Sequence, residues 1–222
     1  MYNRAANMAL TIFDLDNTLI AGDSDYLWGE FLVKKQIVDR VWHQERNDRF
    51  YRDYENGALN IKEWLEFQLK PLVDNKTEEL FALRNEFITT TIKPLILTKA
   101  LAEIKKHADN TILIITATND FITRPIADLL GIKNLLATEF EFKGGKYTGK
   151  IIGAPTYQDG KVARLNLWLQ DKNLDLGESF FYSDSHNDIP LLSLVTYPIA
   201  VDPDPKLRNY AKQHDWQIIS LR

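Results

Sequence analysis

Two aspartates stand two positions apart directly after a short apolar run. Asp14 and Asp16 belong to the segment Asp14-Leu15-Asp16-Asn17-Thr18, which follows the run Ala9–Phe13. If that run is a strand of an open α/β sheet, the pair lies at its carboxyl end, where such sheets bind ligands. Two carboxylates there repel each other and lose hydration, so something cationic must compensate for them. A turn in which aspartate caps a helix is the alternative explanation.

A second polar segment, Thr116-Ala117-Thr118-Asn119, follows the apolar run Thr111–Ile115 and precedes a helical pattern. A hydroxyl beside the free N–H groups of a helix start can hold a phosphate, although a simple helix cap explains the segment equally well. Lys161 follows Gly160 at the start of another helical pattern. A lysine there opposes the helix dipole and needs an anionic partner, unless it is a solvated surface residue.

The last polar segment follows the run Ser179–Tyr182 and reads Ser183-Asp184-Ser185-His186-Asn187-Asp188. Its two aspartates again require a cation or serve as helix caps. Taken in order, successive strand ends carry a carboxylate pair, a hydroxyl and a second carboxylate pair. The chain has no cysteine and only four scattered histidines, so oxygen ligands favour Mg²⁺ over Zn²⁺. Such an ion beside a hydroxyl and a lysine suits the charge of a transferring phosphoryl group.

The elements that must position these residues are visible as apolar patterns. Five compact runs have the character of buried strands: Ala9–Phe13, Thr111–Ile115, Ser179–Tyr182, Tyr197–Val201 and Trp216–Ser220. Four helical patterns alternate with the later runs: Thr98–Ala108, Asp120–Leu130, Lys161–Gln170 and Pro205–Gln213. This alternation predicts a Rossmann-like parallel sheet with helices on both faces. Residues 139–142 and 146–149 alternate around Lys143-Gly144-Gly145, which predicts a β-hairpin.

Residues 21–94 contain no strand-like run and have helical spacing throughout. We therefore expect an α/β core formed by residues 1–20 and 95–222, and an inserted all-helical cap domain at 21–94. Eleven of the 25 aromatic residues fall between Tyr26 and Phe87. Most of these rings are expected to fill the core of a small helical bundle, and a few of them to line a pocket.

The composition excludes several classes of protein. The net charge of −4, without a block of like charges, argues against binding to nucleic acid or to a membrane surface. No apolar run approaches the length of a membrane span or of a signal-peptide core, so a cytoplasmic protein is expected. The predicted partner is a small-molecule phosphomonoester, and the predicted assembly is a monomer or homodimer.

Together, the four polar segments resemble the motifs of the haloacid dehalogenase (HAD) superfamily of aspartate-nucleophile phosphatases. The long helical insertion after the first motif resembles the cap of the phosphoserine-phosphatase-like branch. The resemblance implies that Asp14 is the nucleophile and that Asp16 is the general acid and base. It also implies a Mg²⁺ site and a phosphate site. The metal residues would be Asp14, Asp16 (through its main-chain carbonyl), Asp184 and Asp188, and the phosphate-binding residues would be Thr116, Ala117, Lys161 and Asn187.

The sequence departs from phosphoserine phosphatases at positions that concern the substrate. Thr116-Ala117-Thr118 stands where those enzymes usually carry Ser-Gly-Gly, so the Thr118 side chain should reshape the pocket. Asp23, one methylene shorter, replaces the glutamate that meets the substrate amine, and Asn17 stands where serine is common. No arginine for a substrate carboxylate can be assigned among Arg46, Arg49 and Arg52. Strict phosphoserine specificity is therefore not expected, and other amino-alcohol phosphates, such as histidinol phosphate, are the alternative.

Three other classes compete with a phosphatase. A phospho-accepting receiver domain also uses aspartate, Mg²⁺, threonine and lysine, but it lacks a helical insertion of this length. A catalytically idle binding module would not need every motif residue. A dehalogenase would not need Asp16, because a halide leaving group requires no proton.

Overall fold

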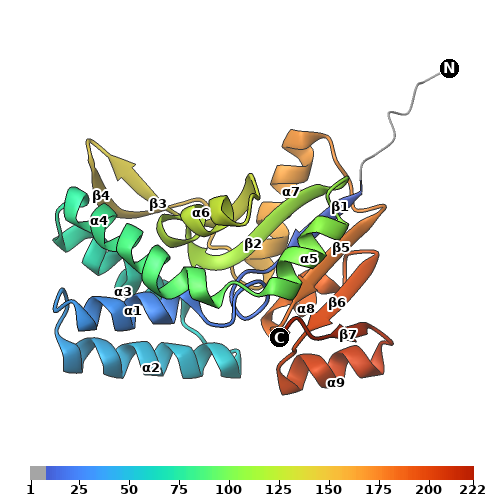
Figure 1. Ribbon diagram of the computed structural model, residues 1–222, viewed down its shortest axis with the longest axis horizontal. Coiled ribbons are helices and arrows are strands. Elements are labelled where there is room, and N and C mark those ends of the chain that lie inside the picture. The colour runs from blue at the N-terminus through green and yellow to red at the C-terminus, as the bar shows by residue number, and fades with distance from the viewer. Residues whose placement is uncertain (1–8) are drawn as a thin grey trace.

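The computed structural model describes residues 9–222 and contains a seven-stranded sheet in the order β4-β3-β2-β1-β5-β6-β7 (Figure 1). Residues 1–8, the first part of the predicted core segment 1–20, lie outside the described residues. Every neighbouring pair of strands is parallel except β3 and β4. The strands are β1 (Leu10–Phe13), β2 (Thr111–Asn119), β3 (Asn134–Lys143), β4 (Lys146–Ile152), β5 (Ser179–Ser183), β6 (Tyr197–Val201) and β7 (Gln217–Ile219). The predicted α/β fold class and its five strands are confirmed.

Two strands differ from the prediction. β2 continues past Ile115 to Asn119, with an irregular register against β3 over that stretch. The predicted hairpin is present, but β3 begins earlier, and its residues 134–136 pair in parallel with β2. The hairpin is therefore joined to the main sheet. Three residues are too few for a periodic pattern to have indicated this.

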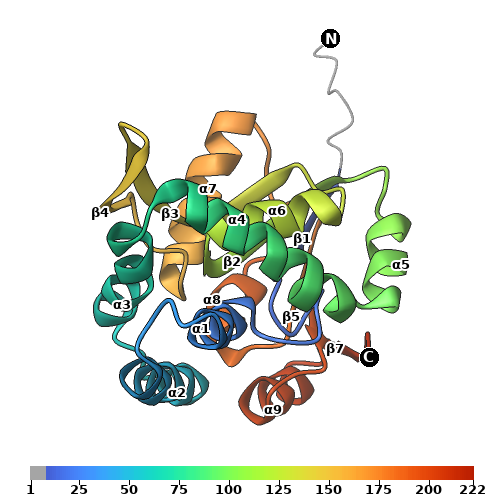
Figure 2. The ribbon, with the colours of Figure 1, turned by 60° about the vertical axis from the view of Figure 1, so that its left-hand side comes forward.

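Helices cover both faces of the sheet (Figure 2). Alternate residues of β1 separate the two apolar layers, because Phe13 packs on one side and Ile12 on the other. The first layer contains α5 (Thr98–Lys106) and α6 (Asp120–Leu129). The second contains α7 (Asp159–Lys172), α8 (Ile189–Leu192) and α9 (Pro205–Gln213). The helices predicted in this part of the chain are thus present within two residues of their expected ends.

The segment between β1 and α5 is helical. Its α-helices are α1 (Ser24–Lys34), α2 (Arg40–Asn56), α3 (Ile61–Asp74) and α4 (Thr77–Phe87), and the chain continues through a π turn, η1 (Ile88–Ile92), and a 3-10 turn, η2 (Lys93–Leu95). The side chains of Asp23, Asp39 and Asn60 cap α1, α2 and α3 by accepting main-chain N–H bonds. Each cap fixes where a helix begins, and so fixes which side chains face the sheet.

α1 and α4 share the apolar layer of α6 and do not form a core of their own. The Trp28 ring lies 5.2 Å from Phe87 and 5.8 Å from Phe121, measured between centroids, which ties α1 to both helices. The outer helix α2 is different: only three of its 17 residues are buried.

The chain leaves the sheet for this helical segment near Ile20 and returns near Ile96, and these two connecting stretches pair with each other. Ile20 and Ile96 form an antiparallel bridge, with the Ala21 N–H donating to the Leu95 carbonyl at 2.8 Å. This pairing sets α1 close to the strand ends that carry the polar segments. In the described part of the chain, no helix combines the length and apolar composition that a membrane span requires.

Candidate active site

A buried lysine joins the carboxylates at the ends of β1 and β5. Lys161 Nζ lies 2.8 Å from Asp14 Oδ1 and 2.7 Å from Asp188 Oδ2, and the lysine is only 2% exposed. The Ser183 hydroxyl donates to the same Asp188 oxygen at 2.7 Å. Three segments that are far apart in the sequence therefore meet at one point. A solvated surface position for Lys161, the alternative left open by the sequence, is wrong.

The local chain explains how Lys161 reaches this point. It is the third residue of α7, and a Cβ atom on the preceding Gly160 would stand 2.0 Å from the Pro155 carbonyl oxygen. Only glycine allows the chain to pass this close. Burial lowers the pKa of Lys161, but the charges of Asp14 and Asp188 outweigh this and raise it above its usual value. The lysine is thus held in its charged form.

The carboxyl group of Asp14 is buried, and the charge of Lys161 offsets only part of the cost of ionising it there. Burial raises the pKa of Asp14 to about 7, even though Lys161 lowers it. The nearby charges of Asp188 and Asp16 raise it further. A positive charge placed here in addition to the lysine would stabilise the ionised form that a nucleophile needs.

Asp16 is held from both sides. Its Oδ1 atom accepts the Ser24 main-chain N–H at 2.7 Å, and its Oδ2 atom accepts the Thr118 hydroxyl at 2.8 Å. Burial and the charge of Asp23 raise the pKa of Asp16 to about 7, while the bonds from Ser24 and Thr118 lower it. A carboxyl group with this pKa can both give and take a proton near neutral pH. Thr118, predicted to face the substrate, therefore also orients Asp16.

The end of β2 lies beside these carboxylates. Thr116, Ala117 and Thr118 line the same pocket as Asp14 and Asp16. The Thr116 hydroxyl accepts the Thr118 main-chain N–H at 3.3 Å. The structure thus places the predicted hydroxyl next to the predicted nucleophile.

Asp184 is bound to the first motif through Thr18. The Thr18 hydroxyl lies 3.2 Å from Asp184 Oδ1, and it accepts the Asp184 main-chain N–H at 3.1 Å. Burial, followed by the charges of Asp14 and Asp188, raises the pKa of Asp184 well above its usual value. The ion pairs formed within residues 9–222 give this carboxylate no cation.

The donor atoms suit a hard divalent cation. Among the described residues, no three acidic or histidine side chains are grouped closely enough to hold a metal by themselves. The ligand set implied by the HAD resemblance needs only two such side chains, those of Asp14 and Asp184, plus the Asp16 main-chain carbonyl. All three donors are oxygens, the ligand type that Mg²⁺ prefers. The excess of carboxylates over cations at this point also fits a bound cation.

Asn187 lies away from the pocket. Its amide nitrogen donates to the Tyr54 carbonyl at 3.0 Å, and its oxygen accepts from Gln158 at 2.9 Å and from Tyr157 at 3.2 Å. The side chain connects the end of α2 to the turn η3 (His186–Asp188). Its predicted contact with a phosphoryl group stays a prediction and requires some of these bonds to open.

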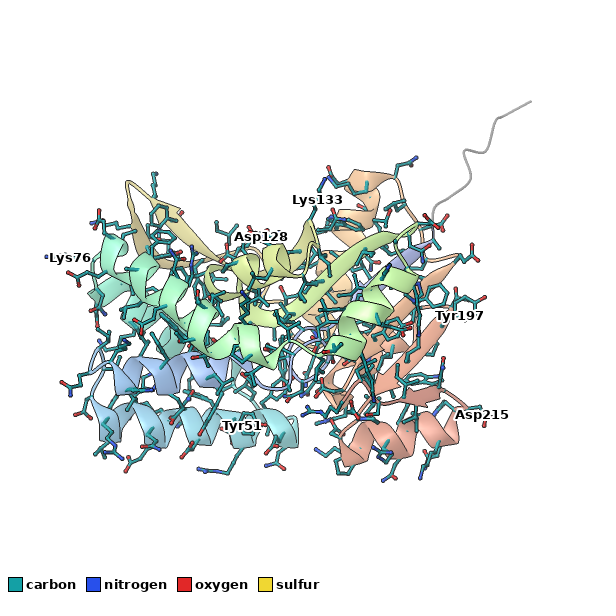
Figure 3. The ribbon with its side chains drawn as sticks, viewed as in Figure 1. Tyr51, Lys76, Asp128, Lys133, Tyr197 and Asp215 are labelled. Atoms are coloured by element: carbon teal, nitrogen blue, oxygen red, sulfur yellow. The ribbon has the colours of Figure 1, made fainter. Side chains whose placement is uncertain are left out.

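The pocket has about 50 Å³ of water-accessible volume, and the empty space in and around it, which includes its opening to solvent, is about 530 Å³. We call the residues that α1, α2, α3 and the α2–α3 connection contribute to it the roof: Tyr26, Asn47, Phe50, Tyr51, Tyr54, Leu59, Trp64 and Gln68. We call the charged and hydroxyl residues at the strand ends and on α7 the floor: Asp14, Asp16, Thr116, Thr118, Lys161, Asp184 and Asp188. Figure 3 shows Tyr51 on α2.

Two acidic residues at the start of α1 stand between floor and roof. Asp23 lines the pocket, as predicted for a substrate-facing residue, but its Oδ1 atom also accepts the N–H groups of Asp25 and Tyr26. Asp25 lines the pocket as well and was missed by the sequence reasoning. Its position two residues after Asp23 was the available signal. The roof residues on α2 had a signal too, because positions 47, 50, 51 and 54 share one helix face.

None of the three arginines considered for a substrate carboxylate lines the pocket. Arg46 lies 4.3 Å above the Trp42 ring, and Arg49 lies 4.4 Å above the Phe50 ring and pairs with Glu63. Arg52 lines an adjoining groove, which shares Asp23, Tyr26 and Tyr51 with the pocket.

Known proteins resemble this chain over most of its length. The family model of haloacid dehalogenase-like hydrolases matches residues 11–193. A histidinol-phosphatase of Neisseria meningitidis is 43% identical, over 96% of this chain and 99% of its own. A phosphoserine phosphatase of Mycobacterium tuberculosis is 29% identical, over 96% of this chain and 71% of its own.

Solved structures agree as well. A Bordetella pertussis protein of unknown function has a TM-score of 0.91 at 41% identity, covering 98% of this chain and all of its own. A phospho-aspartyl intermediate analogue of phosphoserine phosphatase has a TM-score of 0.70 at 19% identity, covering 97% of this chain and 94% of its own, which shows a shared fold. The chain belongs to the haloacid dehalogenase-like hydrolases. Within that family it is a phosphoserine-phosphatase-like phosphomonoesterase.

Proposed function

We propose that this protein hydrolyses the phosphomonoester of a small amino alcohol through an aspartyl-phosphate on Asp14, with Mg²⁺ bound. The observation that carries the proposal is the position of Lys161, buried within 2.8 Å of Asp14 and 2.7 Å of Asp188. A fixed positive charge beside a carboxylate supports the transfer of an anionic phosphoryl group to that carboxylate.

The reaction has two steps in this proposal. A carboxylate oxygen of Asp14 attacks phosphorus, the bond from phosphorus to the ester oxygen breaks, and Asp16 gives its proton to the leaving alkoxide. Water then attacks the phosphorus, Asp16 takes up a proton from that water, and the bond to Asp14 breaks to release inorganic phosphate. Thr116, the main chain of Ala117, and Lys161 bind the phosphoryl oxygens.

The residues that would hold Mg²⁺ are Asp14 and Asp184 through their carboxylates and Asp16 through its main-chain carbonyl. Asp188 would support the bound waters. When bound, the ion neutralises charge on the phosphoryl oxygens. These roles follow from the family pattern and from the oxygen donors present here.

We propose that residues 21–94 act as a cap domain over the floor. The space between roof and floor is small, about 50 Å³ of water-accessible volume, which suits a small metabolite and not a phosphoprotein. Substrate contacts are assigned to Asp23 and Thr118.

Histidinol phosphate is the first candidate substrate. The N. meningitidis relative that is 43% identical is named histidinol-phosphatase. Phosphoserine is the second candidate, because more distant relatives carry the name phosphoserine phosphatase. The absence of an arginine from the described pocket lining favours histidinol phosphate, which has no carboxylate.

The test is release of phosphate from p-nitrophenyl phosphate with Mg²⁺, comparing the wild type with Asp14→Asn. We expect the variant to lose at least about 10³-fold in kcat, because an amide cannot attack phosphorus. Equal activity would exclude the mechanism. A panel of phosphoserine, histidinol phosphate, phosphoethanolamine and sugar phosphates then identifies the substrate. A preference of at least about tenfold for phosphoserine would overturn the assignment.

A further inference from the structure

Nine of the 15 described residues that line the pocket are aspartates or aromatic residues. Four aspartates line it: Asp14, Asp16, Asp23 and Asp25. No lysine, arginine or histidine is among the described lining residues. Lys161 is buried and pairs with Asp14, but it does not line the pocket. The phosphatase chemistry proposed above explains why the aspartates of the floor are present. It does not account for the acids at the start of α1.

The carboxylates of Asp23 and Asp25 at the start of α1 differ in how many hydrogen bonds they accept. Asp23 accepts the Asp25 N–H at 3.0 Å and the Tyr26 N–H at 2.8 Å, and it lies at the positive end of the α1 dipole. Asp25 is 4% exposed and accepts one bond at 3.3 Å from the Asn119 amide, while its Oδ2 atom is buried and has no partner within residues 9–222. A buried carboxylate oxygen without a partner is costly unless a ligand supplies one.

The roof supplies aromatic rings around the same space. Tyr26 and Tyr51 stand 5.2 Å apart between ring centroids, and Trp64 and Phe50 line the pocket with them. The Tyr26 hydroxyl donates to Asp48 at 2.8 Å, which fixes the orientation of its ring. The faces of such rings attract organic cations and repel carboxylates.

We propose that Asp25 determines substrate specificity by pairing with a positively charged nitrogen of the substrate, and that the pocket selects phosphomonoesters that carry a cation and lack a carboxylate. The proposal rests on the phosphatase function proposed above. A protonated amine or imidazole would supply the missing partner of Asp25 and stack against the roof rings. A substrate carboxylate would meet four aspartates and no cationic side chain of the described lining.

The first test uses the wild-type enzyme with Mg²⁺ and three phosphomonoesters that differ by one group at a time. Ethyl phosphate is uncharged beyond its phosphate, phosphoethanolamine adds an ammonium, and phosphoserine adds a carboxylate to that. We expect kcat/KM for phosphoethanolamine to exceed that for ethyl phosphate by at least about tenfold, and phosphoserine to lose that advantage. Equal values for the first two substrates, or the highest value for phosphoserine, would overturn the proposal.

The second test compares Asp25→Asn with Asp74→Asn, which removes an exposed carboxylate from the far end of α3. We expect Asp25→Asn to reduce the ratio of kcat/KM for phosphoethanolamine to that for ethyl phosphate by about tenfold or more, mainly through KM. Asp74→Asn should leave this ratio as in the wild type. An unchanged ratio in Asp25→Asn would refute the role of this residue. If Asp25→Asn does not fold, the wild-type substrate series still decides whether the pocket prefers a cationic substrate. Asp25→Glu, which keeps the carboxylate but moves it by one methylene, then tests the residue through the same ratio.

These tests separate the inference from the function on which it rests. Turnover of p-nitrophenyl phosphate without a preference for the cationic substrate contradicts only the inference. Loss of all phosphatase activity in the wild type contradicts the proposed function itself.

Discussion

The floor and the roof of the pocket are built in different ways. Floor side chains are charged or carry a hydroxyl, are buried or half-buried, and include pairs bonded across long stretches of sequence, such as Lys161 to Asp14 and Thr118 to Asp16. Roof side chains are mostly aromatic and come from α1 to α3, and α2 has only three buried residues. A fixed charge arrangement suits chemistry that is shared across a family, whereas an aromatic surface on a loosely buried helix can change with the substrate.

The largest expected effect comes from removing the central cation of the floor with Lys161→Met. Because Asp14 and Asp188 lose their shared partner, we expect kcat to fall by about 10³-fold and the free energy of unfolding by about 3 kcal/mol. Activity on p-nitrophenyl phosphate and urea unfolding measure the two effects.

The double variant Lys161→Met/Asp188→Asn separates those two effects. It removes one of the uncompensated carboxylates, so stability should partly recover while activity stays low. If Lys161→Met kept wild-type activity, the charged floor would not be part of the chemistry.

A change in the roof should affect stability more than catalysis. In Gly29→Ala the new Cβ would stand 2.7 Å from both His43 Cε1 and Asn47 Nδ2 on α2. Alanine favours a helix over glycine by about 1 kcal/mol, but overpacking costs about 1–3 kcal/mol, so we expect a net loss of about 1 kcal/mol, within a range of about 0–2 kcal/mol. Thermal unfolding measures it. An increased Tm would show that α1 and α2 can move apart freely.

The same contrast explains what the sequence could predict. The strand ends were predictable because Asp14, Thr116 and Asp184 each follow an apolar run, and parallel strands bring such ends together. The roof was not predictable in the same way. Asn47, Phe50 and Tyr54 share a face of α2, but only the tertiary packing decides that this face looks into the pocket. Even a residue inside a motif can differ from its predicted surroundings. The Asn187 amide, predicted to bind phosphate, donates a hydrogen bond to the carbonyl of Tyr54.

The connection between Thr118 and Asp16 predicts an effect that depends on the leaving group. Thr118→Val removes the hydroxyl that lies 2.8 Å from Asp16 Oδ2 and so loosens the proton donor. We expect a loss of about tenfold in kcat/KM for an alkyl phosphate, whose alkoxide must be protonated. The loss on p-nitrophenyl phosphate should be smaller, because nitrophenolate leaves without a proton.

Thr90→Val is the matched control, since this exposed threonine bonds only the Glu86 carbonyl of its own helical segment. It should lower neither rate. An equal loss on both substrates in Thr118→Val would mean that Thr118 shapes the pocket and does not act through Asp16.

The smallest expected effect is a pH dependence of stability that arises at His43 on α2, the helix that carries four of the roof residues. This histidine is 2% exposed, its ring lies 4.6 Å from that of Phe67, and its Nδ1 atom has no partner among the described residues. Burial lowers the pKa of His43 to about 4, below its usual value near 6.5. The stability that His43 contributes is therefore present above pH 6.5 and is lost as the pH falls, because the unfolded chain takes up the proton first. Between pH 7 and 5.5 the contribution of His43 to this loss should be about 1 kcal/mol. It is measured by urea unfolding as the difference in pH dependence between the wild type and His43→Gln, which does not titrate at this position. A variant with the same pH dependence as the wild type would show that His43 contributes no such loss. The buried carboxylates of the floor cannot supply it, because burial raises the pKa values of Asp14 and Asp16, and their protonation favours the folded chain as the pH falls.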